Sequence, residues 1–469
     1  RDAFPQLGAD WQGFGLNDVS SELGFSNDAD VLVVSPQTSE QLLASAEQVA
    51  DMLVDAARIQ RLGSCVTAQL DEACAEQVVN TAGARLFRRP VRSAELQRYL
   101  ALFASISDAS EPRVALKWTL AALLQSPNTL YRRELGDATR VLDNYELASE
   151  LSYTFADSPP DAELRSLAER GELMQAETRV AQAKRLLHSP RGHEALQQFF
   201  REWLRYGSVA TADRPMVSGF AAVRGKLIEE AERFIARAVY EEEVGLSGLL
   251  TAPFSVVDRE LAAYYGWALA GADWSPVTRP QGHGIGVLAQ GALLASASNA
   301  GATSPTQRGL RVYERLLCQT KPRPPANVPP LESSEPDSYR TTREHYELAH
   351  ARGPCASCHV QFDPLGFAFE HFDSGGRFRA DEAGEPIDAS GRWRAELAFS
   401  GQEELASRLA ESAQVADCVS GLLVQYAFGG AGGETCLAED ARLAFREGAS
   451  FVDTVAQLAA AEHFARRSG

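Results

Sequence analysis

At 469 residues this chain is long enough for two or three hydrophobic cores, and its 45% apolar and 23% charged residues are ordinary for a folded globular protein. A disordered or fibrous chain is thereby excluded. The 45 Lys and Arg against 63 Asp and Glu give a formal net charge of -18, which argues against binding to nucleic acid or to anionic lipid. No window approaches 18 consecutive apolar residues, so no integral membrane span is predicted.

The predicted elements begin with an amphipathic helix near residue 36. The chain opens with RDAFPQLG, without an initiator Met or a signal sequence, and we interpret it as a processed form. Ser35 is expected to cap the first helix and Pro36 to occupy its first position, and apolar residues then follow at helical spacing as far as Val54. The same period recurs in many later stretches, which Pro or Gly separates, so the first 270 residues are predicted to be mostly helical.

A proline-rich segment separates this helical part from the rest of the chain. Residues 322–336 include six prolines, which favour an extended polyproline geometry. Beyond it we expect a short helix in TTREHYELAHARG, a small β-hairpin in GRFRADEAGEPIDASGRWR and further helices to the end. The prediction is a mainly α fold with four regions: an N-terminal helical region 1–110, a helical body 111–320, a Pro-rich linker 321–340 and a C-terminal module 341–469.

The cysteine spacing predicts disulfides. Cys65 and Cys74 lie nine residues apart, and Cys418 and Cys436 bracket the stretch VSGLLVQYAFGGAGGET. We expect the bridges Cys65–Cys74 and Cys418–Cys436, with Cys318 left over, either buried and reduced or bridged to another chain. Disulfides indicate an oxidising compartment, and therefore a periplasmic or extracellular protein. The alternative is a cytosolic protein with buried, reduced cysteines.

The remaining two cysteines belong to a motif with its own chemistry. The stretch GPCASCHVQFDPLG contains Cys355, Cys358 and His359 in the spacing C-x-x-C-H. Two thiols at this spacing can add across the two vinyl groups of a haem, and the adjacent histidine can bind the iron, so we predict one covalent haem c. A redox dithiol, half of a zinc site and a plain disulfide are the alternatives. A thioredoxin-like dithiol begins a helix beside a strand, whereas Pro354 precedes this motif, and a zinc site needs a second Cys/His pair, which the neighbouring sequence lacks.

The sixth position of the iron decides between functions. All three methionines precede the motif, so a downstream Met ligand is excluded, and a Met from the helical body, a second histidine or an open position remain. An open position favours reactions with peroxide or oxygen, and two firm ligands favour electron transfer. The candidate residues are Met52, Met174, Met216, His345, His350, His371 and His463.

Charged residues follow the motif closely. Arg377 and Arg379 are expected to form hydrogen-bonded pairs with the haem propionates. Asp363 belongs to a run of acidic residues that we interpret as part of a solvated hairpin rather than a calcium loop, because no EF-hand spacing is present.

Several separate stretches resemble one family. They are ALLQSPNTLYRRELG, YELASELSYTFADSPPDAEL, TSPTQRGLRVYERLLC, PRPPANVPPL and CASCHVQFDPLGFAFEHFDSGGRFR. Over nearly its whole length the chain resembles the planctomycete-type cytochrome c-like family, a group of exported multidomain proteins of unknown function that is also common in myxobacteria. The resemblance implies a leading segment before FPQLGADWQGFG, which we expect to have been trimmed.

The resemblance implies a specific haem site in region 341–469, which would then be a cytochrome c-like haem domain. It implies covalent haem c on Cys355 and Cys358, with His359 as an axial ligand. It favours His350 over His371 as a second iron ligand, since the family has a histidine just before the motif and often an asparagine at the position of His371.

The resemblance supplies no reaction. We expect an exported single-haem c-type cytochrome that acts in electron transfer, or as a haem-dependent oxidoreductase of peroxidase- or oxygenase-like type if the sixth position is open. A haem module of this kind needs on the order of 100 residues, while about 320 precede the linker, so the helical body is expected to bind a redox partner protein or a small-molecule substrate. The alternative is a surface or assembly protein that uses the haem as a structural element and assembles with other exported proteins.

Overall fold

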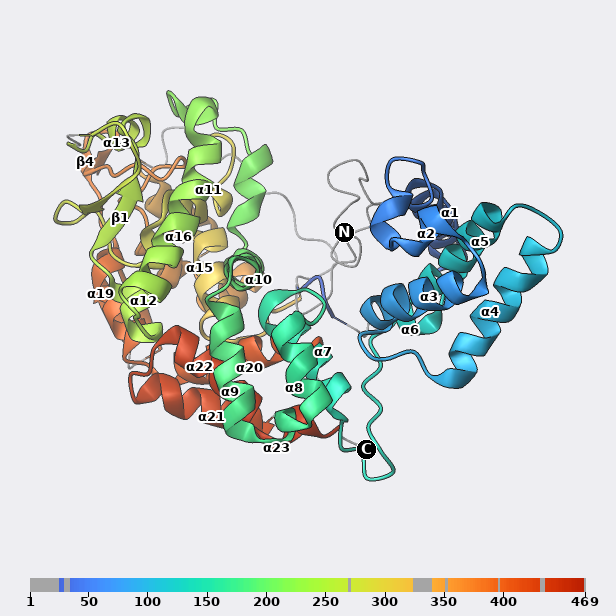
Figure 1. Cartoon of the computed structure of the whole chain (residues 1–469). Helices are drawn as coiled ribbons and strands as arrows, with labels where there is room; N and C mark the ends of the chain where they lie inside the picture. The colour runs from blue at the N-terminus through green and yellow to red at the C-terminus, as the bar shows by residue number, and fades with distance from the viewer. Residues whose placement is uncertain are drawn as a thin grey trace. The chain divides into compact units, whose positions relative to one another are not determined.

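The protein consists mainly of α-helices with three short two-stranded antiparallel sheets in its described part, which confirms the predicted fold class (Figure 1). The chain forms two compact units: the first contains Arg1–Ala195, Ala427–Gly433 and Ala459–Gly469, and the second contains Leu196–Tyr426 and Glu434–Leu458. The computed structural model describes residues 25–28, 34–268, 271–323, 340–350, 353–394, 397–430 and 435–467.

The first unit begins with a group of helices around one hydrophobic core. Ser35 caps the first helix, accepting a hydrogen bond from the backbone N–H of Thr38 at 3.1 Å, and a proline follows at the first helical position as expected. Leu53 and Leu120 lie in the core, which reaches Leu123 and so continues past residue 110. The helices are α1 (Pro36–Leu53), a 3₁₀ helix (Ile59–Leu62), α2 (Cys65–Ala68), α3 (Glu72–Phe87), α4 (Ser93–Ser107), α5 (Pro112–Leu124) and α6 (Pro127–Leu130).

The rest of the first unit is a helical group that the end of the chain completes. Phe155 stacks on Phe464 with ring centroids 5.9 Å apart, and Arg179 donates a hydrogen bond to the carbonyl of Ala459 at 2.8 Å. Terminal residues therefore cover apolar surface that the earlier helices leave. The elements are α7 (Asn144–Ala156), α8 (Ala162–Arg170), a 3₁₀ helix (Glu172–Met174), α9 (Ala176–Leu187), a 3₁₀ helix (Leu458–Ala460) and α23 (Glu462–Ala465).

The second unit begins within α10 and has an aromatic core. Phe200 of α10 packs on Phe451 of α22, with ring centroids 5.0 Å apart, and both side chains are fully buried. Strands β1 and β2 pair antiparallel, with Phe254 opposite Thr278. The elements up to residue 315 are α10 (Pro190–Leu204), a 3₁₀ helix (Tyr206–Thr211), α11 (Phe220–Ala236), a π-helical turn (Arg237–Glu241), α12 (Leu246–Thr251), β1 (Phe254–Val257), α13 (Arg259–Tyr265), β2 (Ser275–Thr278), a 3₁₀ helix (Val287–Ala289), α14 (Gly291–Ser296) and α15 (Pro305–Arg315).

The remainder of the second unit carries the motif and the predicted hairpin. Strands β3 and β4 pair through Asp381 and Pro386, and the two turn residues Ala383 and Gly384 both have positive φ, as a tight hairpin requires. Residues 324–339, most of the predicted linker, lie outside the described part. The elements are α16 (Thr342–His350), α17 (Gly353–His359), α18 (Asp363–Phe367), β3 (Asp381–Glu382), β4 (Glu385–Pro386), β5 (Ser390–Trp393), β6 (Leu397–Ser400), α19 (Gly401–Ala410), α20 (Ala413–Phe428), α21 (Thr435–Arg446) and α22 (Phe451–Gln457).

One predicted disulfide is confirmed and the other is wrong. Cys65 is bonded to Cys74, whereas Cys418 is bonded to Cys318 instead of Cys436, so Cys318 is not left over. The expected pairing followed closeness in sequence, but the bridge that forms spans 100 residues. The side chain of Cys436 lies outside the described part.

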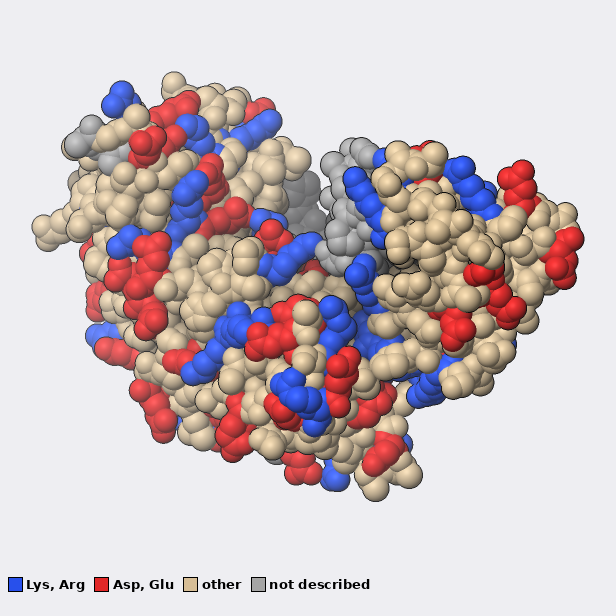
Figure 2. Space-filling view, in the orientation of Figure 1, with Lys and Arg blue, Asp and Glu red and all other residues tan. Residues whose placement is uncertain are grey.

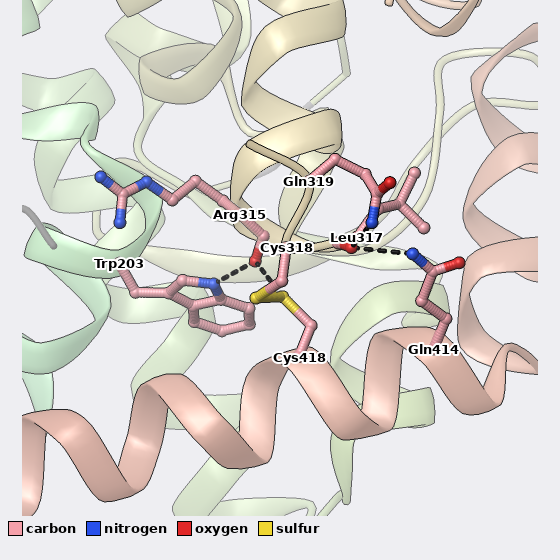
Figure 3. Close-up of a disulfide and its surroundings, with 7 residues drawn as sticks. All are labelled: Trp203, Arg315, Leu317, Cys318, Gln319, Gln414 and Cys418. Atoms are coloured by element: carbon pink, nitrogen blue, oxygen red, sulfur yellow. Dashed lines mark hydrogen bonds between the residues drawn. A yellow bond between two sulfur atoms is a disulfide. The ribbon is translucent and has the colours of Figure 1, made fainter. Parts of the chain in front are cut away.

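Tertiary packing explains the bridge between Cys318 and Cys418. Helix α20 passes beside the end of α15, where Gln414 of α20 donates a hydrogen bond to the carbonyl of Leu317 at 2.8 Å (Figure 3). Trp203 donates from its indole nitrogen to the carbonyl of Arg315, also at 2.8 Å. These contacts hold the two cysteines with their Cα atoms 5.3 Å apart, a distance that suits a disulfide.

Charged side chains of both signs are interspersed over the face of the molecule in Figure 2, so the net charge of -18 is not gathered into one acidic patch on that face. Among the helices of the described residues, none has the length and apolar character needed to cross a membrane.

Candidate functional site

The predicted haem motif lies on the short helix α17, directly after α16. The thiols of Cys355 and Cys358 are partly buried and unbonded. The other cysteines with described side chains all form disulfides. A single short helix therefore presents two thiols together with the imidazole of His359.

The carboxylate of Asp363, at the first position of α18, is the centre of the site. The Nδ1 atom of His350 lies 2.5 Å from its Oδ2, and the Nδ1 atom of His359 lies 3.1 Å from each of its oxygens. The hydroxyl of Thr306 donates a hydrogen bond to Oδ1 at 2.6 Å. The Asp363 side chain is 6% exposed. Four helices, α15 to α18, thus each contribute one polar residue to a buried cluster.

The charge of this carboxylate fixes the protonation of its neighbours. Burial alone would raise the pKa of Asp363, but the hydrogen bonds from the two histidines and Thr306 outweigh burial and hold the pKa below its ordinary value. Asp363 is therefore ionised at neutral pH and can only accept hydrogen bonds. The ring nitrogen that His359 directs at Asp363 must then carry the proton, which leaves its Nε2 lone pair for a metal.

Two glycines allow α15 to bring Thr306 against Asp363. A Cβ atom at Gly309 would lie 1.9 Å from the carbonyl oxygen of Phe362, and one at Gly366 would lie 1.8 Å from the carbonyl oxygen of the first residue of α15. No side chain fits at these distances, so α15 and α18 approach each other backbone to backbone. The glycines are thus a structural requirement of the site.

The two histidines of the cluster lie side by side. Their rings stack with centroids 3.4 Å apart and planes inclined by 26°. Tyr346 packs edge-on against His350 and Phe362 packs edge-on against His359. Two imidazoles that bind one iron from opposite faces of a haem have the macrocycle between them, whereas these rings are in direct contact. Ligation of the iron by His350 stays a prediction, and it requires the two stacked rings to separate.

The cluster also has the composition of a metal site. One ligand atom from each of His350, His359 and Asp363 lies within 4.8 Å of the others. The sequence near the motif offers no second Cys/His pair, but the fold supplies a histidine and a carboxylate next to His359. Two imidazoles and one carboxylate suit zinc or iron. The thiols of the motif do not belong to this group among the described residues.

The two arginines predicted to bind haem propionates already have carboxylate partners. Arg377 pairs with Asp373 through Nε at 2.8 Å. Arg379 pairs with Glu370 at 3.1 Å and with Glu382 at 2.9 Å. Their role toward propionates stays a prediction, and a propionate would have to share these arginines with the carboxylates already present.

Other candidate iron ligands take no part in the hydrogen bonds around Asp363. His371 donates from Nδ1 to the carbonyl of Arg379 at 3.1 Å and stacks on Phe378. Met216 is 76% exposed, and Met52 packs against the core of the N-terminal helices. The structure brings together only His350 and His359 of the residues predicted as ligands, as far as the described residues go.

The residues around the motif fit a covalent haem. Both thiols are free to form thioethers, and Asp363 leaves His359 with an available Nε2. Leu348 and Val360 flank the motif in sequence and are 58% and 66% exposed, so two apolar side chains are available to a bound group.

Sequence reasoning missed two residues of this site. The prediction that places Asp363 in a solvated acidic run is wrong, because the residue is 4% exposed and contacts His359 across the turn between α17 and α18. The spacing of four residues between the two is the local signal of this contact. Thr306 lies 53 residues before His359, and no local pattern connects the two. Its role depends on the packing of α15 against α18.

Three stretches of the chain match models of protein families. Residues 74–134 match PSD5, a protein of unknown function (DUF1595), residues 142–267 match PSD4, a protein of unknown function (DUF1592), and residues 285–382, which include the motif, match PSCyt3, a protein of unknown function (DUF1588). All three are planctomycete cytochrome c-like domains, which supports the resemblance seen in the sequence. No curated protein and no solved structure matches the chain.

Proposed function

We propose that this chain, with its three stretches similar to cytochrome c-like domains, is an exported single-haem c-type cytochrome that acts in electron transfer or as a haem-dependent oxidoreductase. Cys355 and Cys358 would hold the haem through thioether bonds, and Nε2 of His359 would bind the iron. When bound, the haem supplies an iron that exchanges single electrons between its ferric and ferrous states.

The observation that carries the proposal is the state of the cysteines. The bridges Cys65–Cys74 and Cys318–Cys418 fit an oxidising compartment. Cys355 and Cys358 are three residues apart on one helix and partly accessible, yet they are not joined. Attachment to haem vinyl groups gives both thiols a stable bonded state in the same compartment, which is why we favour haem over a redox dithiol.

The chain's own residues would perform three tasks around the iron. Asp363 would orient His359, the exposed apolar side chains of Leu348 and Val360 would be available to contact the haem, and helices α15 and α18 would hold Thr306 and Asp363 in place. Contacts among the described residues assign no ligand to the sixth position of the iron. We therefore keep both electron transfer and reaction with a small oxidant as candidate activities.

The test is expression in a periplasm equipped for c-type haem attachment, followed by a pyridine haemochrome spectrum and haem staining of a denaturing gel. The wild type should give the spectrum and the stain of one haem c. The variant C355S/C358S should lose the stain, whereas S357A, at the exposed position between the two cysteines, should keep it. A wild-type protein that folds without haem would overturn the proposal.

Carbon monoxide then separates the two kinds of activity. A reduced spectrum that carbon monoxide leaves unchanged means two firm ligands and favours an electron carrier. A shifted spectrum means an accessible iron and favours an enzyme, which would next be assayed with peroxide and oxygen.

A further inference from the structure

We infer that Asp363 is a positioning residue that sets the reduction potential of the iron: it holds His359 by Nδ1–H and places a buried negative charge behind this ligand. The inference rests on the proposed function, because it assumes that His359 binds the iron. It goes further in assigning to a residue outside the C-x-x-C-H motif a role in tuning the redox chemistry.

The first step of the argument is the geometry of the hydrogen bond. Both carboxylate oxygens lie 3.1 Å from Nδ1 of His359, so the proton on this nitrogen is shared between them. Histidines that bind metals commonly donate their second N–H to a carboxylate or a carbonyl, which fixes the ring and makes the ligand more basic. A carboxylate does this more strongly than a carbonyl, since it is charged.

The second step is that the charge is confined to this cluster. The residue is 4% exposed, so water screens it little. Its ion-pair partners among the described residues are His350 and His359, with no Lys or Arg. Glu370 makes the contrast, since this equally buried carboxylate contacts Arg308 at 3.5 Å and Arg379 at 3.1 Å. A cation therefore compensates Glu370 but not Asp363.

The third step connects this charge to the iron. Ferric haem carries one more positive charge than ferrous haem, and a nearby anion stabilises the ferric form more. Hydrogen bonds to a ligand and burial are the usual means by which a protein sets a haem potential. Asp363 should thus lower the reduction potential. The hydrogen bond from Thr306 draws negative charge toward Oδ1 and away from His359, so Thr306 should moderate this effect.

The second histidine takes part through the same carboxylate. His350 donates to Oδ2 at 2.5 Å while stacking on the ring of His359. It contacts Oδ2 of Asp363, while Thr306 of α15 donates to Oδ1, so the two partners hold different oxygens of the carboxylate. From this position, His350 supports the orientation of His359.

The experiment measures the midpoint potential by spectroelectrochemical titration of the haem-loaded full chain. The variant D363N keeps the size of the side chain and removes its charge. The control E347Q removes the same charge from an exposed position of α16, where Glu347 pairs with Arg343. We expect D363N to change the ferric-to-ferrous ratio at a fixed applied potential at least tenfold toward ferrous, a rise of about 59 mV or more for one electron. E347Q should leave the ratio within about twofold of wild type.

A second variant keeps the test decisive if D363N loads no haem. T306V preserves the shape of the side chain and removes its hydrogen bond to Asp363, together with the longer contact of 3.4 Å between its hydroxyl and Nδ1 of His359. The potential should then fall, opposite in sign to D363N. A D363N potential equal to that of E347Q, or a T306V potential equal to or above the wild type, would overturn the inference. Absence of haem from the wild type would instead refute the proposed function, so the two failures are distinguishable.

Discussion

Removing the Cys318–Cys418 bridge should destabilise the second unit more than removing Cys65–Cys74 destabilises the first. The two bridges close loops of 100 and 9 residues. In the chain-entropy model, closing these loops in the unfolded state stabilises the folded protein by about 4.7 and about 2.6 kcal/mol at 25 °C. The longer loop contains the whole haem motif, so its loss frees the segment that carries the site.

Native packing around the long bridge should survive the substitution. The hydrogen bonds that Gln414 and Trp203 donate to the end of α15 do not involve the sulfur atoms. The double variant C318S/C418S should therefore fold, and its loss of stability should come mainly from the unfolded chain.

Guanidinium unfolding followed by far-UV circular dichroism measures both effects, with all variants in the same haem state. The free energy of unfolding should fall by about 4 to 5 kcal/mol for C318S/C418S and by about 2 to 3 kcal/mol for C65S/C74S. A loss for the long bridge that is no larger than the loss for the short one would refute the reasoning.

Three further predictions concern packing, pH and ligation. G366A should lower the free energy of unfolding by more than about 2 kcal/mol, because its Cβ would lie 1.8 Å from a backbone carbonyl oxygen. G421A, at a position within α20 where a Cβ would meet no other atom within 4 Å, should raise it by up to about 1 kcal/mol. Equal effects of the two variants in thermal unfolding would contradict this. Burial and the neighbouring carboxylate of Glu134 raise the pKa of Glu150 to about 8, so the folded protein keeps a proton that the unfolded chain releases. This contribution to stability is complete below pH 4.5 and is lost as the pH rises toward 8. E150Q should therefore flatten the dependence of the denaturation midpoint on pH over this range, and a variant with the same slope as the wild type would count against this. H350Q should leave the near-infrared and electron paramagnetic resonance signatures of the iron ligands unchanged, since His350 supports Asp363; loss of a histidine-ligand signal would show that it binds the iron.

Local patterns predicted most of the fold. The N-cap at Ser35, the helical spacing after it and the turn between β3 and β4 each depend on a few neighbouring residues, and all three are found in the structure. The bridge Cys65–Cys74 is also local. The bridge Cys318–Cys418 could not be predicted, because the docking of α20 beside the end of α15 creates it and no local pattern records this contact.

The candidate site divides in the same way. The C-x-x-C-H motif is contiguous and contains His359, and the family resemblance favours His350 among the candidate second histidines. The link between them is Asp363, whose environment is set by α15. Gly309 and Gly366 are far apart in sequence, and together they permit the close contact of α15 with α18 that places Thr306 against Asp363. Such a pairing is visible only in three dimensions.

The central claim is covalent haem on Cys355 and Cys358, and peptide mass analysis of the protein from a haem c-competent periplasm tests it most directly. Trypsin releases residues 353–377 as one peptide, since Arg352 precedes it and Arg377 ends it. The account predicts that this peptide carries the added mass of one haem and that no thiol in it reacts with an alkylating reagent. A peptide of unmodified mass with two alkylated cysteines, from a correctly folded protein, would contradict the account.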